Sequence, residues 1–366
     1  MSNKLTSNGV RKLRIAQIAP MWVSVPPEKY GGTELVIASL VEELVRRGHN
    51  ITLFASGDSK TSAKLVSIYP RALLKDGIPW KDVSYDIFNV AQAFKRAGEF
   101  DIIHSHIDLY DQFFIPFIKT PVVSTMHNNM YASRKTAGRI FTYRHYRKHN
   151  FVSISLKQQE NDMVKLNFVA NVYNGINPEK YKFNSNPENK FIWIARIDKV
   201  KGVYNAILAA EKLGARLDIA GRIDEAVLDF FKSRIKPRLN KKIRYIGEIN
   251  QKQKPEFFGN AKALLYPIEW EEPFGLVMIE ALACGTPVIA FDRGAVSEIV
   301  EDGKTGFVVP PFYKSGRVNI KGLAQAMEKA GQIDRRICRE SFDKNFTAAR
   351  MADDYEKVYE KILRNH

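Results

Sequence analysis

Two glutamates in one short segment form the pattern best suited to chemistry. Residues 269–290 read EWEEPFGLVMIEALACGTPVIA, with Glu272 directly before Pro273 and Glu280 among apolar neighbours. Pro suits the first turn of a helix, and Leu276–Cys284 is expected to be helical. An unpaired carboxylate in such a helix would be costly, which favours a functional role for Glu280 over that of a solvated helix residue. Two such carboxylates can accept hydrogen bonds from paired hydroxyls, one set on a hexose and one on a ribose.

Two cations follow a predicted strand elsewhere in the chain. Residues 194–202 read IARIDKVKG, which places Arg196 and Lys201 just before a helix expected to open at Gly202. Cations beside a helix N-terminus would neutralise a diphosphate without a metal ion. An ordinary surface pair is the alternative. In the glutamate segment, Gly275 likewise leaves the backbone open at a helix start, where amide N–H groups can face hydroxyls or phosphate.

A glycine pair and a histidine complete the candidates. Residues 30–34 read YGGTE, in which Gly31 and Gly32 permit close approach of the backbone to a ligand, although turns also use paired glycines. Residues 124–128 read STMHN, so His127 stands at the end of a predicted strand. Doubly wound folds bind ligands beyond such strand ends.

Other motifs indicate which chemistries to set aside. His104 and His106 alternate on a strand, a spacing that can seat a metal, but no third ligand is evident and a structural role is favoured. The sequence contains no Asp-x-Asp, and no G-x-G-x-x-G follows the first strand, which counts against a nicotinamide enzyme. Cys284 has no evident base beside it and is interpreted as a small core residue. Neither a metal nor a cofactor is expected.

Strands alternate with helices through most of the chain, which argues for parallel sheets covered on both faces. In Glu34–Arg47, apolar residues recur at helical spacing and Gly48 stands where a C′ glycine belongs. Further helices are expected at Gly202–Lys212 and Asp224–Arg234. Strands are expected at Lys12–Ala19, Asn50–Ala55, Asp101–His106, Pro121–Met126, Phe151–Ile154, Val169–Tyr173, Phe191–Ala195, Leu217–Ala220, Ile243–Ile246, Ala263–Tyr266 and Pro287–Phe291.

The length of 366 residues predicts two domains, because single cores rarely grow that large. The alternation breaks in the turn-rich stretch from Tyr173 to Asn189, so the expected domains are residues 1–178 and 179–366. The last helix, about residues 348–364, either stays with the second domain or packs back on the first.

Taken together, these segments resemble the retaining glycosyltransferases of family 4, the group 1 enzymes with the GT-B fold. The resemblance implies an α/β protein of two doubly wound Rossmann-like domains whose parallel sheets face each other across a cleft. The N-terminal domain would take the acceptor and the C-terminal domain the nucleotide sugar. The implied donor contacts are Glu280 with the ribose, Glu272 with the sugar, backbone groups of Phe274, Gly275 and Leu276 with sugar or phosphate, Arg196 and Lys201 with the diphosphate, and Gly31 and Gly32 near the phosphate.

The same resemblance implies transfer of a hexose from a UDP- or GDP-sugar to a glycan, lipid-linked or small-molecule acceptor, with retention. It places His127 near the transferring sugar and gives catalytic roles to His127, Glu272, Arg196 and Lys201. No residue stands out as a nucleophile. The alternatives are another GT-B activity such as a phosphorylase or epimerase, a nucleic-acid-modifying sugar transferase, and a non-catalytic binding protein of the same fold.

The charge of +16 bears on partners rather than on fold. Two basic stretches, Arg134–His149 with its three aromatics and Lys232–Arg244, predict contact with an anionic membrane or lipid-linked phosphate, or else a solvated surface. Nucleic acid is the less favoured partner. Two cysteines, no apolar run of about 20 residues and a polar start predict a cytoplasmic protein, with peripheral attachment at the inner membrane face as an extension.

Overall fold

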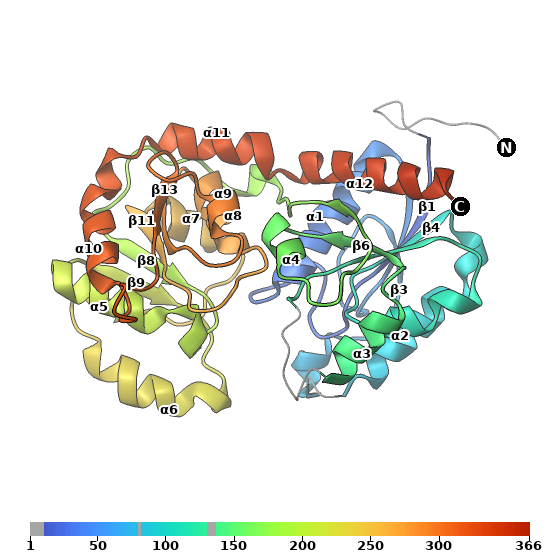
Figure 1. The fold of residues 1–366 in the computed structure, drawn as a ribbon, viewed down its shortest axis with the longest axis horizontal. Coiled ribbons are helices and arrows are strands. Elements are labelled where there is room, and N and C mark those ends of the chain that lie inside the picture. Colours follow the sequence, from blue (N-terminus) through green and yellow to red (C-terminus); the bar gives the residue numbers. More distant parts are fainter. Residues whose placement is uncertain (1–10, 80–81, 130–136) are drawn as a thin grey trace. The chain divides into compact units, whose positions relative to one another are not determined.

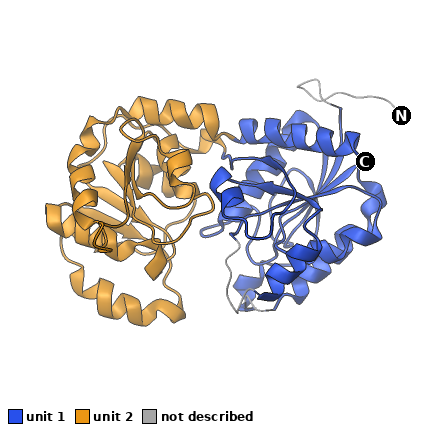
Figure 2. Ribbon diagram, in the orientation of Figure 1, with its two compact units in different colours: residues 1–176, 348–366 blue, residues 177–347 orange. Residues whose placement is uncertain are grey.

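The computed structural model describes residues 11–79, 82–129 and 137–366. The chain forms two compact units, residues 1–176 together with 348–366, and residues 177–347 (Figure 2). Each unit is built around its own parallel β-sheet with helices packed against it (Figure 1). Residues 348–366 return to the first unit, so unit 1 contains both ends of the chain.

Unit 1 contains a seven-stranded sheet of order β3-β2-β1-β4-β5-β6-β7, in which all neighbours pair parallel. The winding direction reverses between β1 and β4. Folds of this kind bind ligands beyond the carboxyl ends of the strands at that point. The strands are β1 (Arg14–Ile18), β2 (Asn50–Phe54), β3 (Lys64–Val66), β4 (Ile102–Ser105), β5 (Val122–Thr125), β6 (Asn150–Ser153) and β7 (Phe168–Asn171).

Helices cover this sheet, and α1 (Gly32–Arg47) shows why they end where they do. Its apolar face is buried, and Gly48 adopts a left-handed φ of 98° from which its N–H bonds the carbonyls of Leu44 and Val45. Glycine accepts that conformation at no steric cost, so the helix stops there. The other helices of unit 1 are α2 (Ser84–Lys95), α3 (Ala137–His145), α4 (Leu156–Glu160) and α12 (Ala348–Arg364).

The helix α12 is held on unit 1 by buried charge as well as by apolar packing. Arg47, at the end of α1, lies 2.6 Å from both Asp353 and Glu356. His49 Nε2 lies 2.8 Å from the second oxygen of Glu356. Since removing one member of a buried ion pair leaves the other uncompensated, these contacts fix the helix position strongly.

Unit 2 contains a six-stranded parallel sheet of order β10-β9-β8-β11-β12-β13. Its four central strands are buried along their whole length, as expected where helices cover both faces, whereas the edge strands β10 and β13 are partly exposed. The six strands are β8 (Phe191–Ile194), β9 (Leu217–Ala220), β10 (Ile243–Tyr245), β11 (Ala263–Tyr266), β12 (Val288–Phe291) and β13 (Gly306–Val309).

One expected helix of unit 2 is wrong as a single element. The stretch Asp224–Arg234 divides into a 3₁₀ turn, the short α6 (Leu228–Phe230) and a π-helical turn over Phe231–Ile235. Pro237 follows at once, and because proline lacks an N–H it cannot continue an α-helical ladder. The remaining helices are α5 (Val203–Leu213), α7 (Lys254–Gly259), α8 (Leu276–Ala283), α9 (Val296–Ile299), α10 (Ile320–Lys329) and α11 (Arg335–Asn345).

The two parallel sheets confirm the predicted α/β class. Across the described part of the chain, no helix combines the length and apolar character needed to cross a membrane.

Candidate active site

Glu272 lies in unit 2, in the loop between β11 and α8, and its side chain is nearly buried. A single carboxylate oxygen, Oε2, accepts three hydrogen bonds: from Lys201 Nζ at 2.7 Å, from the Tyr266 hydroxyl at 2.7 Å and from the Trp270 indole at 2.9 Å. Hydrogen bonds to a charged group are stronger than neutral ones, so these donors hold the carboxylate in one orientation.

The backbone around Lys201 is held as tightly as its side chain. Its carbonyl accepts a hydrogen bond from the Trp193 indole at 3.1 Å, and its ammonium stands 4.3 Å from the centre of the Trp270 ring. The next residue, Gly202, has a φ of 75°, and a Cβ there would lie 1.8 Å from the carbonyl oxygen of Pro267. Only glycine fits, because the loops that follow β8 and β11 touch at this point.

Arg196, the second predicted phosphate contact, also follows β8 but is less constrained. Its Nη2 lies 3.2 Å from Asp198, its Nη1 lies 3.9 Å from Asp224, and the side chain is 38% exposed. The structure therefore places a fixed cation and a more accessible one at the carboxyl end of the same strand.

A second glutamate, which the sequence analysis did not single out, fixes the loop that carries Glu272. Glu271 accepts hydrogen bonds from the Arg293 guanidinium at 2.8 Å and from the N–H of Gly294 at 2.6 Å. The N–H of Ala295 donates to the carbonyl of Glu272 at 3.0 Å. The loop after β12 thus clamps both glutamates, and only long-range packing reveals this role for Glu271.

The predicted backbone contacts lie at the start of α8, immediately after Glu272. Gly275 is the N-cap residue with a φ of 90°, and a Cβ on it would lie 3.3 Å from Glu272 Cγ. Phe274 is buried, whereas Gly275 and Leu276 are partly accessible. The first N–H groups of a helix have no partner within it, so this helix start can bind an anion or hydroxyls.

Glu280 lies inside α8 and is only 1% exposed. Its Oε1 accepts a hydrogen bond from the Tyr181 hydroxyl at 2.7 Å, and Lys254 Nζ lies 3.0 and 3.3 Å from its two oxygens. Burial and the adjacent carboxylate raise the pKa of Tyr181 well above its usual range, so this hydroxyl stays a donor. Glu280 is therefore paired within the protein by two side chains, Tyr181 and Lys254, that the sequence analysis did not single out.

The glycine pair lies in unit 1. Gly31 precedes α1 with a φ of 142°, and a Cβ there would lie 2.8 Å from Pro27 and 2.9 Å from the carboxyl of Glu34; Gly32 begins the helix. Burial raises the pKa of Glu34 to about 7, against an ordinary 4.5. The glycine loop is thus backed by a carboxyl group that changes charge near neutral pH.

His127 follows β5 in unit 1 and belongs to a chain of histidines at the strand ends. Its Nε2 lies 2.9 Å from Nδ1 of His106, which follows β4. Burial lowers the pKa of His127 to about 4 and that of His104 to about 3, and the pKa of His106 also falls well below its usual range. All three rings are therefore neutral at pH 7.

The sequence analysis considered a metal-binding role for His104 and His106, and in the structure both side chains form hydrogen bonds within unit 1. His104 is hydrogen-bonded to Tyr359 at 2.7 Å and to Thr125 at 2.7 Å. His106 is hydrogen-bonded to Gln17 of β1 at 2.8 Å and to His127, which follows β5, at 2.9 Å. Among residues 11–79, 82–129 and 137–366, no group of three or more His, Cys, Asp or Glu side chains is arranged to hold a metal ion. Cys284 is buried, and burial raises its pKa to about 12, as befits a core thiol.

Two family models match the chain. Glycosyl transferases group 1 matches residues 176–341, and Glycosyltransferase Family 4 matches residues 30–180. Between them the models cover the glutamate segment, both cations, the glycine pair and His127. The chain is a group 1 glycosyltransferase resembling family 4.

Similar proteins extend over nearly the whole chain. The glycosyltransferase is 24% identical over 374 residues to N-acetyl-alpha-D-glucosaminyl L-malate synthase of Bacillus anthracis, covering 92% of this chain and 95% of the relative. The sucrose-phosphate synthase of Thermosynechococcus elongatus superposes with a TM-score of 0.79 at 19% identity, covering 97% and 100% of the two chains. Anabaena HepE, solved in complex with UDP-glucose, gives 0.70 at 17% identity, covering 95% and 100%. The predicted GT-B fold is confirmed.

The first basic stretch of the glycosyltransferase is only partly exposed, and Arg134 and Lys135 lie outside the described residues. Arg144, Arg147 and Lys148 are exposed at and beyond the end of α3, and Phe141 is 74% exposed.

Tyr143 does not join this surface, so the expectation for it is wrong. Its hydroxyl donates to Asp108 at 2.5 Å, and its ring packs edge-on against Phe151 in the core. Arg139 is also engaged, since it pairs with Asp108 at 2.6 Å.

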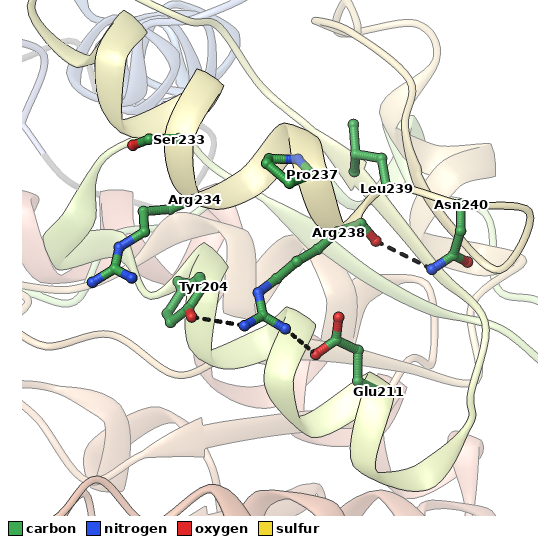
Figure 3. Close-up of a pocket in the computed structure, with 8 residues that line it drawn as sticks. All are labelled: Tyr204, Glu211, Ser233, Arg234, Pro237, Arg238, Leu239 and Asn240. Carbon is green, nitrogen blue, oxygen red and sulfur yellow. Dashed lines mark hydrogen bonds and ion pairs between the residues drawn. The ribbon is translucent and has the colours of Figure 1, made fainter.

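The second basic stretch of the glycosyltransferase borders a surface pocket of about 480 Å³. Figure 3 shows Arg238 reaching Glu211, at 2.6 Å, and the Tyr204 hydroxyl, at 3.1 Å. Arg234 and Arg238 also lie 5.6 and 5.2 Å from the Tyr204 ring centre. These contacts support the solvated-surface interpretation of this stretch. The pocket is lined by Tyr204, Glu211, Ser233, Arg234, Pro237, Arg238, Leu239 and Asn240.

Proposed function

We propose that this glycosyltransferase moves a hexose from a UDP- or GDP-sugar to its acceptor with retention of the anomeric configuration. One observation carries the proposal: Lys201 Nζ lies 2.7 Å from Glu272 Oε2, beside the start of α8. A fixed cation and helix N–H groups can bind a leaving diphosphate, and a fixed carboxylate can accept hydrogen bonds from sugar hydroxyls.

The cations and the helix start support the departure of the nucleoside diphosphate. Negative charge grows on the leaving oxygen as the glycosidic bond breaks, and preorganised donors stabilise that charge more in the transition state than in the ground state. Lys201 and Arg196 serve this role, and the N–H groups that follow Gly275 at the start of α8 add the helix dipole. Removing one such donor typically costs about a hundredfold or more in rate.

The hydrogen bonds of Glu272 favour a binding role over nucleophilic attack. Three donors converge on its Oε2, and each lowers the availability of that oxygen's electrons. Glu272 is assigned to the hydroxyls of the donor sugar. The catalytic contribution is then positioning and electrostatic stabilisation, with His127 assigned to the transferring sugar.

Glu280 is assigned to the ribose of the donor. A carboxylate offers about four lone-pair sites, and three contacts, from Tyr181 and Lys254, are present here, so one ribose hydroxyl can be added and a second can replace a Lys254 contact. The UDP-glucose complex of HepE supports a UDP-sugar. No metal is needed in this scheme, because side-chain cations and a helix start face the diphosphate.

The acceptor is assigned to a glycan, a lipid-linked sugar or a small molecule. The name of the Bacillus anthracis relative, a synthase of an L-malate glycoside, supports the last class. The exposed Arg144, Arg147 and Lys148, with Phe141 nearby in sequence, support reversible contact with an anionic membrane, to which each basic residue contributes about 1 kcal/mol. We place the protein in the cytoplasm, with this contact at the inner membrane face.

The test is a thermal-shift panel of UDP-, GDP- and ADP-sugars, followed by turnover with the best donor. A donor present at 100 times its Kd stabilises the folded state by about 2.7 kcal/mol. Release of a nucleoside diphosphate, with the product's anomeric configuration read by NMR, completes the assignment. A shift without diphosphate release under any acceptor would instead identify a binding protein, and inversion would refute retention.

A further inference from the structure

A chain of neutral side chains leads from the core of unit 1 to His127. Gln17, on β1, lies opposite His104 of β4 in the strand register and is fully buried. Its Oε1 lies 2.8 Å from His106 Nε2, and His106 Nδ1 lies 2.9 Å from His127 Nε2. Gln17 lies near the carboxyl end of β1, and His106 and His127 follow the ends of the adjacent strands β4 and β5, at the point where the winding of the sheet reverses.

The orientation of the Gln17 amide is fixed on its other side. Its Nε2 donates to the Tyr359 hydroxyl at 3.1 Å, and this hydroxyl lies 2.7 Å from His104 Nδ1. The amide nitrogen also lies 3.3 Å from His104 Nδ1, and the amide oxygen, which can only accept, faces His106. Tyr359 belongs to α12, which means that the C-terminal helix sets the direction of the whole chain.

Elementary hydrogen-bond chemistry then decides where each proton lies. The amide oxygen only accepts, so His106 Nε2 carries the hydrogen of that bond. A neutral imidazole has one N–H, so His106 Nδ1 is an acceptor and His127 Nε2 must be the donor. His127 is neutral as well, and its Nδ1 therefore carries a lone pair and accepts.

We propose that Gln17 and His106 are positioning residues that hold His127 as its Nε2–H tautomer, so that Nδ1 accepts a hydrogen bond from a hydroxyl of the transferring sugar. The inference rests on the proposed function for the identity of the ligand, but the tautomer itself is a property of unit 1. In the Nε2–H tautomer, Nδ1 of His127 can accept a hydrogen bond from a sugar hydroxyl. In the Nδ1–H tautomer, the same nitrogen would be a donor and could not accept that hydrogen bond.

The first experiment needs no activity. The seven histidines of the ¹⁵N-histidine-labelled protein can be followed by long-range ¹H–¹⁵N correlation spectra, with His127 and His106 assigned by single substitution. Both rings should show the Nε2–H pattern, unchanged between pH 6 and 8. An Nδ1–H pattern for His127 would overturn the proposal whatever reaction the protein performs.

The second experiment removes the amide. Gln17→Met keeps the length and burial of the side chain but cannot bond His106, so His127 should populate both tautomers. The turnover number should fall by about tenfold while the Kd of the free nucleoside diphosphate stays unchanged. Gln112→Met is the matched control, because Gln112 is also buried in unit 1 but donates to Asp111 and Ser124, both at 2.9 Å, and is hydrogen-bonded to none of His104, His106 and His127. An unchanged His127 tautomer in Gln17→Met, or the same change in Gln112→Met, would refute the positioning role of Gln17 and leave the donor assignments untouched.

Discussion

Lys201 Nζ and Glu272 Oε2 lie 2.7 Å apart although 71 residues separate them in sequence. Backbone contacts hold both members of the pair. Gly202, next to Lys201, packs closely against the carbonyl of Pro267, just after β11. The N–H of Ala295, in the loop after β12, donates to the carbonyl of Glu272. In the proposed function, this cation and this carboxylate exchange their mutual contact for phosphate and sugar hydroxyls when the donor binds.

Lys201→Ala should lower turnover by about 100-fold and also weaken donor affinity, because charge on the leaving diphosphate grows in the transition state. Steady-state kinetics and calorimetric binding of the nucleoside diphosphate measure the two effects. Lys199→Ala, an exposed lysine on the same turn, is the control and should change neither. If the whole loss in kcat/KM were matched by the loss in binding, Lys201 would only anchor the donor.

Glu280→Gln should raise the Kd of the nucleoside diphosphate by about 10- to 100-fold with little effect on kcat, since ribose contacts persist in ground and transition states. Glu256→Gln, on exposed surface of α7, provides the matched loss of a carboxylate. Equal affinities of Glu280→Gln and the parent protein would disprove the ribose assignment.

Turnover should continue in excess EDTA. Arg196, Lys201 and the start of α8 supply the positive charge that a divalent ion provides at metal-dependent diphosphate sites. The measurement is diphosphate release before and after chelation in the same buffer. Loss of activity that Mg²⁺ or Mn²⁺ restores would overturn this expectation.

Glu34 should make the folded state less stable as pH rises. Its folded-state pKa of about 7 lies above the ordinary 4.5, so the folded protein binds more protons between these values and loses stability from pH 4.5 to pH 8. The shift corresponds to about 3 kcal/mol. Glu34→Gln should flatten the dependence of Tm on pH over this window.

Part of the slope will remain in Glu34→Gln, because burial also raises the pKa of Asp86 and Asp111 to about 6. Glu360→Gln, a partly exposed carboxylate at the end of α12, should leave the slope as it is. An unchanged slope in Glu34→Gln would mean that this carboxyl is charged in the folded protein.

Vesicles containing anionic lipid should bind the protein in a salt-sensitive manner, and neutral vesicles should not. The triple change of Arg144, Arg147 and Lys148 to Glu should abolish cosedimentation, because three attractive charges become repulsive. A matched triple change in the second basic stretch, at Lys232, Lys236 and Lys241, tests whether position matters rather than net charge. Equal partition of parent and Arg144 variant proteins would remove the membrane contact from the proposal.

Local patterns were enough to predict many elements of the fold. The apolar spacing of α1 and the glycine after it fixed that helix to within two residues, and the alternation of strands with helices predicted parallel sheets. The helix expected at Asp224–Arg234 failed because propensity could not anticipate a π-helical turn before Pro237.

In the candidate site, too, local sequence signals identified some residues but not their distant partners. Glu280 attracted attention because its immediate neighbours are apolar, which is a local signal. Its partner Tyr181 lies 99 residues away, and Gln17 and Tyr359 are separated by 342 residues. No periodicity or motif connects such pairs, since only the folded sheet brings them together. The roles given to the site residues stay predictions until the variants are measured.

Because α12 belongs to unit 1, the last residues of unit 1 are translated only after the whole of unit 2. N-terminal domains generally fold first as the ribosome proceeds. Here unit 2, residues 177–347, is translated in full before Glu356 and Tyr359 exist to meet Arg47 and Gln17. A nascent chain halted at residue 347 would therefore carry a complete C-terminal unit and an N-terminal unit whose buried polar groups still await the last helix.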